Sequence, residues 1–195
     1  VKESMEQMIQ DEITELIVQP THILDGIENN IMKEDVLSYK EEFQSIVFGA
    51  PLLSSEKDSQ AIIHAISEEF PDLASKDALV LMGHGTAHHV NVVYSSLNKA
   101  FKSMGYSNFF LGTVEAEPTV QDLVTEVEDF QPDKIVLTPF MIVAGDHAHN
   151  DMAGTEPDSW LHQFRQMNEN VCPILKGLGE YPGIRSMFIE HIQDA

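Results

Sequence analysis

Five of the nine histidines in this 195-residue chain fall within two short segments. They divide between MGHGTAHH and GDHAHND, as His84, His88, His89, His147 and His149. Each segment follows an apolar run, ALVLM or IVLTPFMIV, that is typical of a buried β-strand. Imidazole is a frequent ligand of divalent metals and a common proton acceptor near neutral pH. The spacing therefore predicts groups with metal or acid–base chemistry at the ends of two strands.

A carboxylate stands at the end of a third predicted strand. Glu115 ends FFLGTVE, just as His84 follows ALVLM and His147 follows IVLTPFMIVAG. Because ligands of open parallel sheets bind at the carboxyl ends of the strands, we expect these three side chains to converge. Two imidazoles and one carboxylate would hold a divalent metal and leave coordination positions open. Gly83 and Gly85 flank His84 and allow a flat ligand to approach the backbone closely.

Each of these residues has a purely structural interpretation when it is taken alone. His84 could hydrogen-bond the backbone in a turn, Glu115 could be a surface acid, and His147 could lie in a solvated loop. Because the three groups follow three separate strands, a shared functional site is the favoured interpretation.

The intervening segments predict the scaffold that positions these residues. Three apolar strands are expected at Ala78–Met82, Phe109–Glu115 and Lys134–Val143. Between them we expect an amphipathic helix over His89–Met104 and a second helix capped by Thr119. Strands that alternate with helices indicate β-α-β units. The predicted class is therefore α/β, with parallel sheets flanked by helices on both faces.

A short internal repeat links the beginning of the chain to its second half. LIVQPTHILDG, from Leu16 to Gly26, resembles IVLTPFMIVAG, from Ile135 to Gly145. The proline and the final glycine of the two segments match at an offset of 119 residues. The repeat indicates two similar α/β halves.

The repeat also sets the expected limits of the halves. We expect residues 1–70 to be the remainder of an N-terminal α/β half, and residues 71–195 to be a C-terminal half that carries the metal site. By the same offset, the counterpart of the strand that begins at Ala78 would precede residue 1. The first half is therefore expected to be incomplete, with a sheet edge that a partner chain could cover in a homo-oligomer.

Charge and cysteine content narrow the function classes. The chain carries 32 acidic and 11 basic side chains, a net charge of −21. Nucleic acids and anionic membranes bind clustered Lys and Arg, so neither is an expected partner. Cys172 is the only cysteine, which excludes an internal disulfide and leaves the cytoplasm as the default location. The sequence contains no Walker A pattern, so use of ATP is not expected.

At these residues the sequence resembles the anaerobic cobalt chelatases, the sirohydrochlorin cobaltochelatases of the class II chelatase group. The similar segments lie between Leu79 and Ile192 and read MGHGTAHHVN, LGTVEAEP, LTPFMIVAGDHAHNDMAG, DSW and GLGEYPGIR. The resemblance implies two similar α/β halves with the site in the cleft between them. It also implies ATP-independent insertion of Co²⁺ into a sirohydrochlorin-type tetrapyrrole, in anaerobic cobalamin (vitamin B12) biosynthesis.

The resemblance carries the family's two histidines and glutamate onto His84, Glu115 and His147. Two pyrrole N–H protons must leave the ring as the metal enters. A neutral His84 would accept a proton, Glu115 would assist or bind the metal, and His147 would hold the metal on the cleft side. These ligands suit Fe²⁺, Ni²⁺ and Zn²⁺ as well as Co²⁺, so metal supply is expected to select the physiological ion.

Three alternatives stay open at the level of sequence. The first is a ferro- or nickel-chelatase acting on the same tetrapyrrole. The second is a non-catalytic relative that binds a divalent ion without processing a tetrapyrrole. The third is a metal-dependent hydrolase, which usually needs more carboxylate ligands, and Asp146 and Asp151 could supply them.

Overall fold

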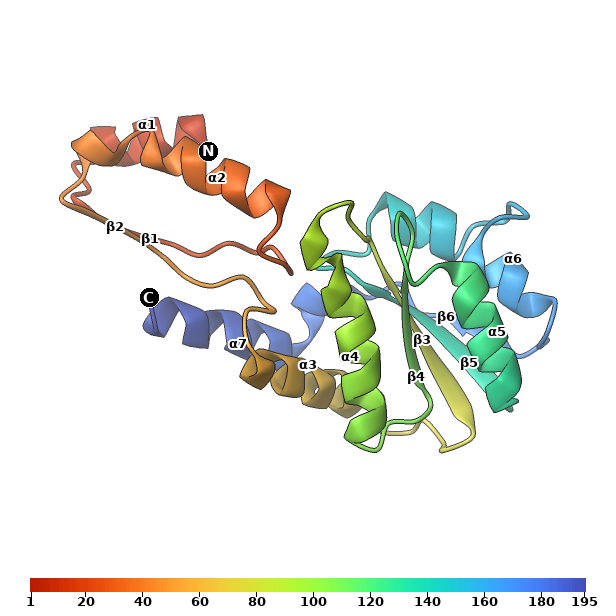
Figure 1. Cartoon of the computed structure of the whole chain (residues 1–195). Helices are drawn as coiled ribbons and strands as arrows, with labels where there is room; N and C mark the ends of the chain where they lie inside the picture. Colours follow the sequence, from red (N-terminus) through yellow and green to blue (C-terminus); the bar gives the residue numbers. More distant parts are fainter.

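Four parallel strands form the larger of two sheets in the computed structural model, which describes residues 1–195 (Figure 1). Their order is β4-β3-β5-β6, and their bounds are Asp77–Gly83 for β3, Phe109–Thr113 for β4, Lys134–Phe140 for β5 and Val171–Pro173 for β6. The two central strands are buried along almost their whole length. This burial explains their continuous apolar sequences, since helices cover both faces of the sheet.

Helices pack on the two faces of this sheet and form two separate cores. One face contacts α3 (Glu56–Glu69), α4 (Val92–Ser103) and α7 (Pro182–Gln193). The other face contacts α5 (Val120–Phe130) and α6 (Trp160–Arg165). Side chains of β3 alternate between the two cores, as the two-residue period of a strand requires. The predicted α/β class with helices on both faces is thus confirmed.

The smaller unit contains two parallel strands and two helices. Strands β1 (Glu15–Val18) and β2 (Ser45–Phe48) pair in parallel, and α1 (Lys2–Gln10) and α2 (Ile27–Leu37) lie on one side of the pair (Figure 1). The core of this unit consists of three buried residues, Met5, Val36 and Phe43. A two-stranded sheet buries little apolar surface, so the unit depends on its two helices and on contacts with the rest of the chain.

A polar contact between α3 and α7 of the larger unit reaches the segment that connects the two units. The imidazole of His191, on α7, lies 3.0 Å from the Asp58 carboxylate and 3.0 Å from the carbonyl oxygen of Ala50. The side-chain amide of Gln19, which follows β1, donates to the same Ala50 carbonyl at 2.8 Å. Burial raises the pKa of Asp58, but hydrogen bonds from His191, Ser55 and Ser54 outweigh it and hold that pKa below its usual value.

Helix α3 packs with the larger unit. Its residues Ile62, Ile63 and Ile66 are fully buried in the core shared with β3, β4 and β5. The helix also contacts α7 and α4. The division into residues 1–70 and 71–195 stays a prediction, and the packing of α3 favours a boundary in the segment that precedes this helix.

The observed elements differ from the expected ones mainly at their ends. β4 stops at Thr113 and not at Glu115, because the Thr113 N–H turns to donate to the carbonyl of Pro118. β5 ends at Phe140, and α4 is preceded by a 3₁₀ turn, η2 (His89–Asn91). Further short turns are η1 (Lys40–Glu42), η3 (Ala148–Met152) and η4 (Leu178–Glu180). No helix of the chain combines the length and the apolar composition that crossing a membrane needs.

Candidate metal centre

The three predicted ligands lie together at one edge of the larger sheet. His84 follows β3, Glu115 follows β4 and His147 follows β5, and these three strands are neighbours. One ligand atom from each residue lies within 4.8 Å of the other two. The Glu115 carboxylate is 3.7 Å from Nε2 of His84, and the rings of His84 and His147 meet edge to face with centroids 4.8 Å apart.

Hydrogen bonds fix which nitrogen of each histidine faces the site. Nδ1 of His84 lies 2.9 Å from the carbonyl oxygen of Gly85, which only accepts, so Nδ1 carries the proton. Nδ1 of His147 lies 2.5 Å from the carboxylate of Asp151. Both imidazoles therefore keep the Nε2 lone pair for a metal or a proton. A carboxylate on the far nitrogen of a histidine is a common way to orient a metal ligand.

The backbone around His84 is held by two neighbouring segments. The N–H of Glu115 donates to the carbonyl of His84 at 2.9 Å, which joins two of the three predicted ligands directly. Gly85 has a φ of +86°, and a Cβ there would lie 2.9 Å from Ala116 N and from Thr113. The phenol of Tyr94 accepts from the Gly85 N–H at 3.4 Å, and burial raises the pKa of that phenol.

His147 is placed by a single π-helical turn, η3. Ala148 and Met152 of this turn are fully buried, so the turn is anchored in the core at the sheet edge. His149 points elsewhere: it is exposed, and its Nδ1 lies 3.0 Å from the carbonyl of Gly145. The side chains of the three converging residues are 37–55% exposed, so an ion can reach them from solvent.

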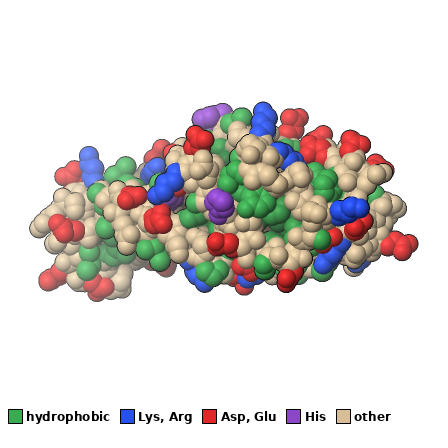
Figure 2. Space-filling view, turned by 90° about the horizontal axis from the view of Figure 1, so that it is seen from below, with side chains coloured by type: hydrophobic (Ala, Val, Ile, Leu, Met, Phe, Trp, Pro, Cys, Tyr) green, Lys and Arg blue, Asp and Glu red, His purple; other side chains and the backbone are tan.

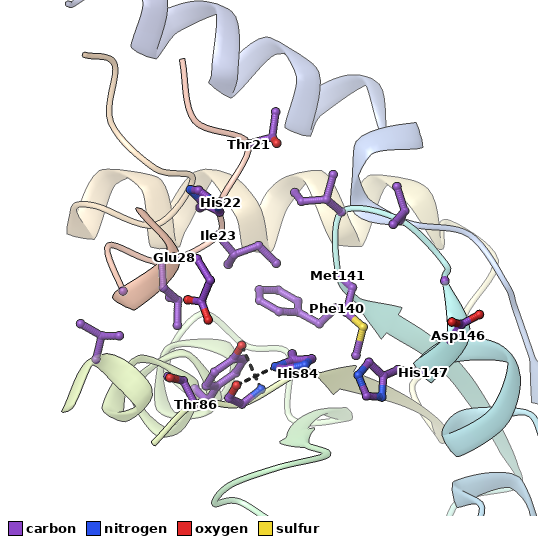
Figure 3. Close-up of a pocket in the computed structure, with 18 residues that line it drawn as sticks. Thr21, His22, Ile23, Glu28, His84, Thr86, Phe140, Met141, Asp146 and His147 are labelled. Carbon is purple, nitrogen blue, oxygen red and sulfur yellow. Dashed lines mark hydrogen bonds between the residues drawn. The ribbon is translucent and has the colours of Figure 1, made fainter. Parts of the chain in front are cut away.

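Two of the three residues line a cavity of about 470 Å³ between the two units (Figure 3). The larger unit contributes His84, His147, Phe140, Met141 and Tyr94, and Glu115 lies beside His84 at its edge. The smaller unit contributes Thr21, His22, Ile23 and Glu28. The lining is mostly apolar and has polar groups on both units, which is typical of a site that binds a small molecule.

His22 and Glu28 are cavity residues that the sequence interpretation did not include. One signal could have identified Glu28, because the repeat offset of 119 residues places it opposite His147. His22 offers no such signal, because its counterpart in the second segment is Met141. Its place in the cavity depends on how the two units pack.

The negative charge of the chain is distributed over the surface. Acidic side chains lie along the whole length of the face shown in Figure 2, interspersed with Lys and Arg. The lining of the cavity contains acidic residues and histidines but no Lys or Arg. A cation entering this cavity therefore meets no repelling ammonium or guanidinium group.

Comparison with known proteins places this geometry in a family. The sequence model of the cobalt chelatase (CbiK) family matches residues 1–195. The chain is 35% identical over 181 residues to the sirohydrochlorin cobaltochelatase of Salmonella typhimurium, a match that covers 93% of this chain and 68% of that protein. It is 29% identical over 198 residues to sirohydrochlorin cobaltochelatase CbiKC of Nitratidesulfovibrio vulgaris, covering 100% of this chain and 70% of that protein.

Solved structures show the same fold. SirB from Bacillus subtilis with Fe³⁺ matches with a TM-score of 0.69 at 18% identity, over 100% of this chain and 76% of that one. The sirohydrochlorin chelatase SirB from Bacillus subtilis subspecies spizizenii, in complex with cobalt, matches with a TM-score of 0.62 at 15% identity, over 100% of this chain and 74% of that one. The match over the whole chain and the identity to the Salmonella protein establish that this chain belongs to the cobalt chelatase (CbiK) family.

Proposed function

We propose that His84, Glu115 and His147 form the site at which this chelatase inserts Co²⁺ into a sirohydrochlorin-type tetrapyrrole. The observation that carries the proposal is the convergence of their ligand atoms within 4.8 Å beside a cavity of about 470 Å³. The named activity of the Salmonella and Nitratidesulfovibrio relatives supports the same substrate and metal. The reaction would serve anaerobic cobalamin biosynthesis.

The chemistry of insertion matches the three residues. A tetrapyrrole and M²⁺ give the metallo-tetrapyrrole and two protons, so the site must first hold the ion and then release it. Nε2 of His147, oriented by Asp151, would hold the metal, with Glu115 as an anionic ligand. Nε2 of His84 would share the metal and accept a pyrrole proton once the metal has moved to the ring.

The metal range follows from the ligand types. Imidazole and carboxylate bind Co²⁺, Fe²⁺, Ni²⁺ and Zn²⁺, and intrinsic affinity places Ni²⁺ above Co²⁺. Solved chelatases with this fold contain Fe³⁺ or cobalt, which supports a range wider than one ion. We therefore propose that the supply of metal selects Co²⁺ over the ferro- and nickel-chelatase reactions.

The remaining features of the proposal rest on composition and packing. The absence of a Walker A pattern supports a reaction without ATP. A single cysteine cannot form an internal disulfide, which favours the cytoplasm. Ile17 and Val47 pair on the open face of the β1–β2 sheet and are 52% and 39% exposed, which supports burial of this face in a homo-oligomer.

The geometry gives no support to a metal-dependent hydrolase. Such an enzyme usually needs further carboxylate ligands, for which the sequence offers Asp146 and Asp151. The Asp151 carboxylate is hydrogen-bonded to Nδ1 of His147. Neither aspartate is among the three converging groups.

An anaerobic absorbance assay with sirohydrochlorin and Co²⁺ tests the proposed function. We expect the wild type to exceed the uncatalysed rate and His147→Ala to lose that excess. His149→Ala is the matched control, because His149 lies on the same turn and outside the site. A wild type that binds Co²⁺ through His147 but gives no metallated product would instead identify a non-catalytic metal-binding relative.

A further inference from the structure

The wall of the cavity that belongs to the smaller unit contains one imidazole, His22 (Figure 3). His22 lies in the segment between β1 and α2, on a different unit from His84, Glu115 and His147. Its side chain makes a single hydrogen bond, from Nδ1 to the side chain of Asn29 at 3.2 Å. Its other nitrogen, Nε2, therefore has no protein partner.

A series of hydrogen bonds between side chains fixes the tautomer of His22. The amide nitrogen of Asn29 donates to the Asp25 carboxylate at 2.5 Å, and Lys33 donates to the same carboxylate at 3.3 Å. The hydrogen bond from Asn29 is the main reason why the pKa of Asp25 lies below its usual value, so this group is a carboxylate and only accepts. The amide oxygen of Asn29 must then face His22, and Nδ1 of His22 must donate to it.

This arrangement leaves an unprotonated Nε2 on neutral His22. Asn29 has no exposed surface, so the orientation of its amide cannot change without breaking buried hydrogen bonds. Nε2 of His22 is therefore available to accept a proton.

Metal insertion releases two protons from the ring, and each must pass to an acceptor. If His147, Glu115 and His84 present the metal from one wall, the proton released toward the other wall needs an acceptor there. His22 and Glu28 are the only side chains of that wall that can accept a proton. An imidazole is ordinarily a stronger base than a carboxylate near neutral pH, which favours His22 for this step.

The geometry points to His22 as a second proton acceptor, serving the face of the tetrapyrrole opposite the metal-holding residues; this inference rests on the proposed chelatase function. Two pyrrole N–H bonds break, and the four ring nitrogens bind M²⁺. One proton passes to Nε2 of His22 and the other to Nε2 of His84 after that atom has released the metal. The imidazolium of His22 then returns its proton to solvent.

The test is the anaerobic chelation assay with His22→Ala, with kcat and KM for sirohydrochlorin measured separately. Loss of a positioned base typically costs about 100-fold or more in rate, so we expect kcat to fall by about that factor. Free imidazole added to the assay should restore part of the rate. The affinity for Co²⁺ without tetrapyrrole should stay unchanged, because His22 is not among the converging ligands. His64→Ala, an exposed histidine on α3, is the matched control.

Each outcome separates the inference from the proposed function. A kcat within about twofold of wild type, or a rise in KM alone, would overturn the role of His22 while leaving the chelatase intact. If His22→Ala does not fold, His22→Gln keeps an amide donor toward Asn29 and should show the same loss of kcat. An inactive wild type would overturn the proposed function itself and the inference with it.

Discussion

The two walls of the cavity are built in different ways. On the larger unit, three adjacent strands place the proposed metal ligands at one edge, and a backbone hydrogen bond joins Glu115 to His84. On the smaller unit, the imidazole of His22 is held by side chains, through Asn29 and Asp25. The first wall is fixed by the sheet, whereas the second depends on a few polar contacts. We therefore expect metal binding to survive changes in the smaller unit and turnover to be sensitive to both.

The largest effect should come from removing a ligand on the larger wall. His147→Ala leaves one imidazole and one carboxylate, and we expect the affinity for Co²⁺ to fall by more than about 100-fold, beyond the range for loss of an outer hydrogen-bond partner. Co²⁺ titration by absorbance measures this. An equal loss of Co²⁺ affinity in His22→Ala would contradict the expectation that only the larger wall binds the metal.

The two carboxylates that support the histidines provide a second test of the comparison between the walls. Asp151 contacts His147 directly, whereas Asp25 reaches His22 through Asn29. Asp151→Ala should weaken Co²⁺ binding by about 10–100-fold, because it removes the group that orients a metal ligand. Asp25→Ala should leave Co²⁺ affinity unchanged and lower only the chelation rate. The two variants are compared by metal titration and by the anaerobic assay.

The contact between α3 and α7 of the larger unit should contribute to stability. Asp58→Asn weakens the contact with His191 and should lower the free energy of unfolding by about 1–3 kcal/mol at neutral pH. Because the folded-state pKa of Asp58 is lowered, its contribution is complete above the usual value of 3.8 and is lost as the pH falls through the folded pKa. Urea unfolding at several pH values should thus show the variant and wild type converging below about pH 4. A difference that grows in acid would contradict this account.

The smallest effect is expected on the open face of the smaller sheet. Ile17 is 52% exposed, so Ile17→Thr should change the free energy of unfolding of a monomer by less than about 0.5 kcal/mol. In a homo-oligomer that buries this face, the same variant would weaken assembly. Sedimentation at several concentrations distinguishes the two cases.

The sequence predicted the larger unit better than the smaller one. Continuous apolar strands and the rule that ligands lie at their carboxyl ends were sufficient to place His84, Glu115 and His147 at one edge. Helix α2 was not predicted, because one of its two buried residues is the polar Asn29 while Ile27 and Ile31 are exposed, which disrupts the usual apolar periodicity. The role of the smaller unit as a cavity wall follows from packing between distant segments, which no local pattern encodes.

A single-turnover experiment tests the central claim most directly. The protein is loaded anaerobically with one equivalent of Co²⁺ and mixed with sirohydrochlorin together with excess chelator that captures free Co²⁺. If His84, Glu115 and His147 hold the ion for direct transfer, up to one equivalent of cobalt-sirohydrochlorin should form despite the chelator, and none should form with His147→Ala. Complete suppression of product by the chelator in the wild type would contradict the account.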